Sequence, residues 1–186
     1  MTDFNKSIVC TEYGVYEPIT KDDAQLIIDI RRSAENSVLH EISSSLAAQQ
    51  SYFDRYKRRF DENKEIYFKI FQKGGAKCLG LVRLTELDGD RRFNFQSLIF
   101  RKDSPPFLAI DTIFTMYELG FVKMSKDICG PWLVPRSGTQ VRKLHLKMGI
   151  ATEVMANENY YFFIVTKDIF VQRREFFKNL GFGLQK

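Results

Sequence analysis

The chain has 186 residues, which is enough for one domain with a sizeable core, and we expect residues 1–186 to form a single domain. Hydrophobic residues make up 44% and charged residues 27%, a composition that excludes an intrinsically disordered chain. The net charge of +5 suits an anionic small ligand or general solubility, and without a basic stripe in a recognisable module it predicts no nucleic-acid partner.

Three further classes of protein are disfavoured. No apolar run approaches the ~20 residues that span a bilayer, and MTDFNKSIVC lacks the pattern of a signal peptide, so we expect a cytoplasmic protein without a membrane partner. Cys10, Cys78 and Cys129 are widely spaced and are expected to be reduced thiols. Only two histidines are present and no cluster has metal-ligand spacing, so the sequence predicts no metal site.

The first sixty residues predict one strand and two helices. GVYEPIT (14–20) has the pattern of a short strand, and a helix follows with Thr20 as N-cap and Asp23 three residues later, as in a capping box. SLAAQQSYFDRYKRRF (45–60) returns to helical spacing of apolar residues after a polar turn region.

A three-stranded antiparallel meander is expected next. IYFKIFQ (66–72) and AKCLGLVRLTEL (76–87) are predicted strands, and Gly74-Gly75 between them indicates a hairpin. A second turn at Asp88-Gly89 leads into a third strand, RFNFQSLIF (92–100).

The second half of the chain alternates between helices and strands. The expected elements are a helix over 106–122, a strand over 127–135, a short helix over 137–149 that ends at Gly149, a strand over 159–166 and a terminal helix over 171–181. A meander followed by strand, helix and strand predicts an α+β fold, with a mixed but mostly antiparallel sheet flanked by helices.

The connection FRKDSPPFLAIDTIF (100–114) joins a predicted strand to a predicted helix, a common place to hold phosphate. It contains no glycine, but Pro105-Pro106 can start a helix at little cost, because the proline N–H would be unpaired there anyway. The backbone amides of Phe107, Leu108 and Ala109 would then be free at the positive end of the helix dipole. The alternative is a proline-initiated helix that binds no ligand.

Three segments resemble the GCN5-related N-acetyltransferase (GNAT) superfamily. LHLKMGI (144–150) is similar to the family's L-Y-x-K-x-G-F, in which a helix carrying the catalytic tyrosine ends at glycine. FNFQSLIFRKDSPPFLAIDTIFTMYELGF (93–121) resembles a branch with K/R-x-x-A-P-P-x-x-A-I before a long helix. VLHEISSSLAAQQSYFDRY (38–56) resembles that branch's L-H-x-x-S-x-S-L-x-x-Q. The resemblance covers roughly residues 14–166.

The resemblance implies acetyl-coenzyme A (acetyl-CoA) as donor and a primary amine as acceptor. Two central strands that splay apart would admit the pantetheine arm, and the pyrophosphate would lie at the N-terminus of helix 106–122. The residues implied in coenzyme binding are Leu98, Ile99, Phe100, Arg101, Lys102, Ser104, Phe107, Leu108, Ala109, Gly138 and Arg142. Gly138 stands where the family often has Asn. Arg136, Arg142 and Lys143 either meet the coenzyme's 3′-phosphate or form a solvated face.

Two departures from the family pattern bear on activity. Most members have Q/R-x-x-G-x-G/A before the helix, where this chain has residues 101–106 without glycine. His145 stands where the family has the tyrosine, and it either donates a proton or a hydrogen bond to the departing thiolate or is a structural histidine. REFFKNLGF (174–182) also resembles the tyrosine motif but has Phe177 at that position, so we prefer 144–150.

The acceptor side lacks the usual base, because strand 92–100 contains no carboxylate. His40 and Glu41, in the turn after the first helix, are the candidate bases, with loop or capping roles as the alternative. Tyr160, Tyr161 and Trp132 either line the site or pack in the core.

The leading hypothesis is therefore an acetyl-CoA-dependent N-acetyltransferase that acts by direct transfer. Members of the resembling branch are linked with surface-polysaccharide pathways, which favours a nucleotide-linked amino sugar as acceptor and places a protein α-amine second. The competing hypothesis is a GNAT-fold protein that binds a ligand or partner without turnover. A homodimer is left open.

Overall fold

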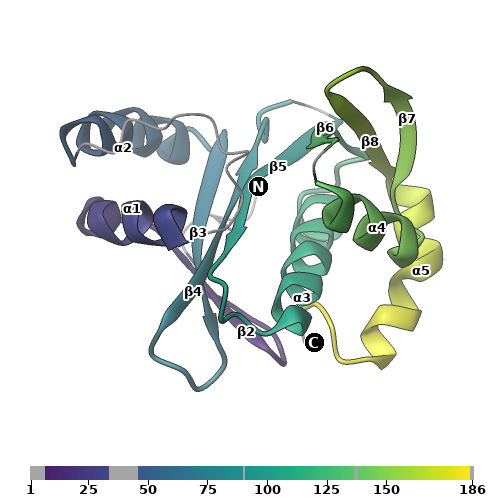
Figure 1. Ribbon diagram of the computed structural model, residues 1–186, viewed down its shortest axis with the longest axis horizontal. Helices are drawn as coiled ribbons and strands as arrows, with labels where there is room; N and C mark the ends of the chain where they lie inside the picture. The colour runs from purple at the N-terminus through teal and green to yellow at the C-terminus, as the bar shows by residue number, and fades with distance from the viewer. Residues whose placement is uncertain (1–6, 34–45, 90, 137, 185–186) are drawn as a thin grey trace.

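The computed structural model describes residues 7–33, 46–89, 91–136 and 138–184 (Figure 1). Within them an eight-stranded sheet has the order β1-β2-β3-β4-β5-β6-β8-β7. The strands are β1 (Val9–Cys10), β2 (Gly14–Pro18), β3 (Glu65–Gln72), β4 (Cys78–Thr85), β5 (Arg92–Phe100), β6 (Ile128–Pro135), β7 (Thr152–Ala156) and β8 (Tyr160–Thr166). The helices are η2 (Lys21–Asp23), α1 (Ala24–Ser33), α2 (Leu46–Asp61), α3 (Pro106–Tyr117), η3 (Glu118–Lys123), α4 (Thr139–Met148) and α5 (Lys167–Asn179).

The predicted α+β class and the antiparallel meander β3–β4–β5 are confirmed. Only β5 and β6 pair in parallel among the described strands. Two edge strands, β1 and β7, were not predicted. The terminal helix begins at Lys167 rather than at residue 171, because Thr166 caps it by accepting a hydrogen bond from the backbone N–H of Ile169.

Helices cover both faces of the meander. In Figure 1, α1 and α2 lie on one side of β3 and β4, and α3 lies on the other. The α1–α2 side buries a small apolar cluster that includes Ile27, Phe53 and Tyr67. The α3 side buries a larger cluster that joins β3–β6 to α5. Because both faces are covered, β3 and β4 are buried nearly throughout, on both faces of the sheet.

Candidate functional site

The two parallel strands at the centre of the sheet diverge soon after they begin. β5 and β6 pair only at Arg92↔Ile128 and Phe93↔Cys129, although the strands are 9 and 8 residues long. Further along, Ile99 and Phe100 pair with β4 on one edge. Their other edge, which faces β6, has no strand partner in the described part of the chain. Backbone groups along that edge are therefore available to an extended ligand.

Irregular backbone on both strands marks this divergence. The register between β4 and β5 shifts past Ser97, whose φ is 51°, as expected for an extra residue in the strand. On β6 the register shifts between Cys129 and Trp132, where Gly130 has φ 103° and precedes a cis peptide bond to Pro131. A side chain at Gly130 would lie 2.7 Å from the carbonyl oxygen of Phe163, so the bulge requires glycine there.

Asn94 connects the strands where their ladder stops. Its Nδ2 donates to the carbonyl oxygen of Pro131 at 3.0 Å, which replaces a ladder hydrogen bond. Since this bond fixes the orientation of the amide, Oδ1 is left as an acceptor, and it is buried without a partner. A polar ligand group in the divergence would satisfy it.

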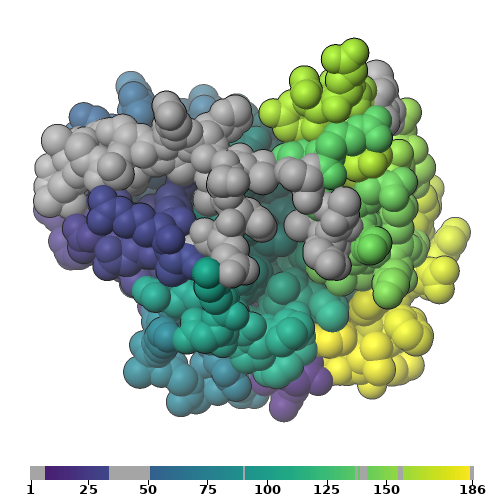
Figure 2. All heavy atoms as spheres, viewed as in Figure 1, coloured from purple at the N-terminus to yellow at the C-terminus, as the bar shows by residue number. Residues whose placement is uncertain are grey.

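Helix α3 begins one short turn after β5. Pro105 is its N-cap residue and Pro106 occupies the first helical position, as the sequence predicted. The prediction of three free amides is wrong for Leu108, whose N–H donates to the Pro105 carbonyl at 3.0 Å. Ala109 is the fourth helical residue, so its N–H takes part in the first turn of the helix, which leaves the N–H of Phe107 without a backbone partner among the described residues. Figure 2 shows this start of α3 (teal) on the surface, between the β3–β4 hairpin (blue) and the C-terminal segment (yellow).

The turn before α3 is held by β4. Ser104 Oγ donates to the carbonyl of Leu79 at 2.9 Å and Arg101 Nε donates to that of Cys78 at 3.1 Å. Asp103, whose charge would oppose a phosphate, forms an ion pair with Lys77, and this contact lowers the pKa of its carboxyl. Its charge is thus balanced by that of Lys77.

Helix α4 carries His145 into the core rather than to the surface. His145 is 1% exposed, and its ring centroid lies 4.2 Å from that of Trp132, with Phe163 beyond. Burial lowers the pKa of His145 to about 3, so the ring is neutral near pH 7, and Nδ1 has no hydrogen-bond partner. An imidazolium is not available as a general acid here, which leaves the single N–H of the neutral ring.

The basic residues near α4 are largely engaged. Arg142 Nε is 2.9 Å from Glu153, and its guanidinium lies 4.5 Å from the ring centroid of Tyr161. Arg136 covers the same ring at 4.3 Å and also donates to its hydroxyl. The N–H of Gly138, the N-cap of α4, donates to the Pro135 carbonyl at 2.8 Å, so it is not a free donor.

Solved acetyltransferases share this architecture. FdhC, described as a nucleotide-linked sugar GNAT, superposes with a TM-score of 0.83 at 20% sequence identity, covering 95% of this chain and 99% of its own. The chain has the GNAT fold. A chimera of the spermidine N-acetyltransferase SpeG from Vibrio cholerae and hSSAT gives a TM-score of 0.68 at 15% identity, covering 85% and 98%. No family model and no curated protein sequence matches the chain.

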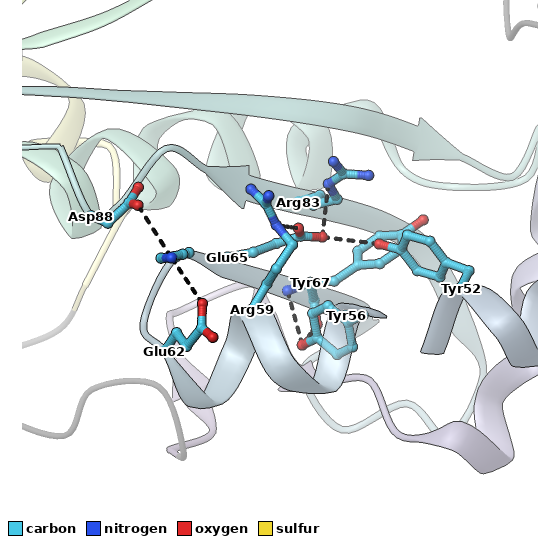
Figure 3. A network of polar contacts seen from close by, with 9 residues as sticks. Tyr52, Tyr56, Arg59, Glu62, Glu65, Tyr67, Arg83 and Asp88 are labelled. Atoms are coloured by element: carbon cyan, nitrogen blue, oxygen red, sulfur yellow. Dashed lines mark hydrogen bonds and ion pairs between the residues drawn. The ribbon is translucent and has the colours of Figure 1, made fainter. Parts of the chain in front are cut away.

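Sequence reasoning missed a polar network on the α1–α2 side of this GNAT fold. Figure 3 shows Arg59, Arg83 and Tyr52 converging on Glu65. Glu65 is only 2% exposed and accepts from Arg59 Nε at 2.8 Å and from the Tyr52 hydroxyl at 3.0 Å. Arg83 Nε lies 3.0 Å from the same carboxylate, but its N–H points off the line of a hydrogen bond, so the contact is electrostatic. Burial also raises the pKa of Tyr52, so its hydroxyl stays a donor.

The sequence of the two strands that carry this network does contain a signal that could have predicted it. Polar residues alternate with apolar ones in EIYFKIF (65–71) and LVRLT (81–85), which places Glu65, Arg83 and Thr85 on one face of the sheet. The candidate bases His40 and Glu41 lie outside the described residues. The described residues contain no group of three or more His, Cys, Asp or Glu arranged to hold a metal ion, and none of their helices is long and apolar enough to cross a membrane.

Proposed function

We propose that this protein is an acetyl-CoA-dependent N-acetyltransferase acting on a primary amine. The observation that carries the proposal is the divergence of β5 from β6, with the N-terminus of α3 directly after β5. The divergence offers unpaired strand edge to a pantetheine arm, and the free amide of Phe107, at the positive end of the helix dipole, offers a donor to a pyrophosphate. Arg101 and Lys102 add positive charge close to this helix start.

The reaction is a direct transfer. The unprotonated amine attacks the thioester carbonyl, the new C–N bond forms, the C–S bond breaks, and the coenzyme leaves as a thiolate. The neutral ring of His145 is proposed to donate a hydrogen bond that stabilises this thiolate, which needs no imidazolium. The proton lost by the amine passes to a base, for which His40 and Glu41 remain the proposals.

The favoured acceptor is an amino sugar on a nucleotide carrier. Its support is the similarity to FdhC, described as a nucleotide-linked sugar GNAT, over 95% of this chain. A protein α-amine is the second candidate. SpeG, at a lower TM-score, is named as a spermidine acetyltransferase, so polyamines belong in any acceptor panel.

Calorimetry with acetyl-CoA, coenzyme A and pantetheine tests the coenzyme site. We expect both coenzymes to bind and pantetheine, which lacks the pyrophosphate, to bind at least tenfold more weakly, because charge-assisted hydrogen bonds at a helix start contribute about 1.5–3 kcal/mol. A thiol-release assay over amino sugars, peptides and polyamines then identifies the acceptor. Absence of acetyl-CoA binding at millimolar concentration would rule the enzyme out, and binding without thiol release would favour the non-catalytic alternative.

A further inference from the structure

The side of the sheet covered by α1 and α2 carries more positive charge than its carboxylate balances. Arg59 and Arg83 approach the buried carboxylate of Glu65 from α2 and β4. Arg31 approaches from α1 and donates Nη2 to the hydroxyl of Tyr67 at 3.3 Å, with no carboxylate partner in the described residues. Among the described residues, two guanidiniums thus share one carboxylate and the third has none, which leaves two positive charges in excess.

These arginines keep donors to spare. Arg59 and Arg83 each contact Glu65 through Nε, and neither donates a hydrogen bond from a terminal nitrogen to another of the described residues (Figure 3). The side chain of Arg83 is 23% exposed and that of Arg59 is 47% exposed, so a ligand can reach both. The Nε of Arg31 is buried and unpartnered. Guanidinium forks match the oxygen geometry of phosphate, so this donor set suits a doubly charged phosphate group.

Polar residues lead from this arginine cluster to the divergence of β5 and β6. Across the ladder, Arg83 pairs with Gln96, and Thr85 pairs with Asn94, on strands about 4.8 Å apart. Thr85 is 3% exposed and Asn94 6% exposed, and each has a buried oxygen, Oγ1 and Oδ1, without a hydrogen-bond partner. Such atoms are costly to bury unless a ligand satisfies them.

We propose that Arg31, Arg59 and Arg83 bind a phosphate or diphosphate of the acceptor, with Thr85 and Asn94 contacting the part that carries the amine. This assignment rests on the proposed function, since it places the acceptor amine at the divergence where the thioester would lie. It also predicts that polyamines are rejected. A polycation meets two uncompensated like charges, and Glu65 is already shared by two arginines.

Calorimetry with UDP and with inorganic pyrophosphate tests the cluster, with and without saturating coenzyme A to occupy the α3 site. We expect UDP to bind in the presence of coenzyme A, and Arg31→Gln to weaken it about tenfold or more, as loss of a charge-assisted contact does. Arg31 has no carboxylate partner among the described residues, so this variant leaves none of their carboxylates unpaired. Arg83→Lys retains a positive charge opposite Glu65 but loses the forked guanidinium, so it should weaken UDP binding as well.

The matched control is Lys57→Gln, which removes one positive charge from an exposed ion pair with Asp61 on α2 and should change UDP affinity less than twofold. Equal losses in the control and in Arg31→Gln would overturn the site, and so would unchanged UDP binding in Arg31→Gln. Tight pyrophosphate binding that both arginine variants retain would also overturn it. If coenzyme A fails to bind while Arg31→Gln still weakens UDP, the acetyltransferase proposal falls and the phosphate site stands.

A second readout is turnover. The wild type should acetylate a nucleotide-linked amino sugar with a kcat/KM far above that for the free amino sugar or for spermidine. Arg31→Gln should raise KM for the nucleotide-linked acceptor and leave KM for acetyl-CoA unchanged. Spermidine turnover equal to that of the nucleotide-linked acceptor would overturn the proposal.

Discussion

At the scale of single residues, burial decides which protonation state His145 can use. The sequence of a short amphipathic helix does not predict the pKa of a histidine on it. The desolvation of His145 comes from Trp132 and Phe163, which lie on β6 and β8. The sequence predicted the short helix that carries His145, now α4, but not the environment of the ring. The hydrogen-bonding role stays open to a neutral imidazole, and the acid role of an imidazolium does not.

This burial predicts a pH-dependent stability. Because the pKa of His145 is lowered to about 3, the unfolded chain binds its proton near pH 6.5 while the folded chain does not. Stability contributed by the neutral ring is therefore fully present above about pH 6.5 and is lost as pH falls toward 3. His145→Phe, which keeps an aromatic ring beside Trp132, should lose less stability than the wild type over this range, by on the order of 1 kcal/mol per pH unit.

Urea unfolding at several pH values between 4 and 7.5 measures this difference. His40 is present in both proteins, so its titration cancels in the comparison. Parallel stability profiles for the two proteins would show that His145 titrates normally and is not buried as described.

At the scale of elements, the end of helix α3 is built around one close approach. Gly120 lies in the π-helical turn η3, and a Cβ added there would come within 2.1 Å of Cζ of Phe93, which is fully buried on β5. The contact joins η3 to the start of β5, the short stretch that still pairs with β6.

Gly120→Ala should therefore destabilise the protein by about 1–3 kcal/mol through overpacking. Phe93→Leu opens the same space, so the double variant should be more stable than the sum of the two single effects predicts, with a coupling of roughly 0.5–3 kcal/mol. Chemical unfolding of the wild type, the two single variants and the double variant completes this double-mutant cycle. Gly89→Ala is the control, since a Cβ there meets only ordinary contacts, and it should not couple to Phe93→Leu. Additive single effects would argue against the close approach.

Elements with strong periodicity were predictable, and those made by long-range contacts were not. Predicted strand 92–100 matches β5, and predicted strand 66–72 differs from β3 by one residue, because aromatic and β-branched residues recur along both. β7 was missed because TEVMA is short and half polar, and it becomes a strand only by pairing with β8. The arginine cluster could not be predicted either, since its members come from α1, α2 and β4 and meet only through the fold.

At the scale of the whole molecule, the sheet consists of two halves, β1–β5 and β6–β8–β7, joined by few contacts at its centre. Two residue pairs and the hydrogen bond from Asn94 to Pro131 connect the strands there. The C-terminal segment adds a second link, because the N–H of Gly183 donates to Asp111 on α3 and Arg174 on α5 pairs with the buried Glu118. The ligand proposed for the divergence would contact both halves and should stabilise their arrangement.

That arrangement gives the last prediction. Asn94→Ala removes the bridge and should cost about 1 kcal/mol of unfolding free energy, since it removes the partly buried hydrogen bond to the Pro131 carbonyl. It should also weaken the binding of coenzyme A, because the distance between β5 and β6 in the divergence is no longer fixed by this hydrogen bond. A ligand at 100 times its Kd stabilises a protein by about 2.7 kcal/mol, so tenfold weaker binding reduces that increment by roughly half.

Thermal or urea unfolding with and without coenzyme A at a fixed concentration measures the increment in each protein. The control is Asn157→Ala, which removes hydrogen bonds from a surface turn between β7 and β8 and should lower stability while leaving the coenzyme increment unchanged. An equal increment in the wild type and in Asn94→Ala would mean that Asn94 only stabilises the sheet. An increment reduced in Asn94→Ala alone would tie the width of the divergence to coenzyme binding, as expected if the ligand lies between the two halves.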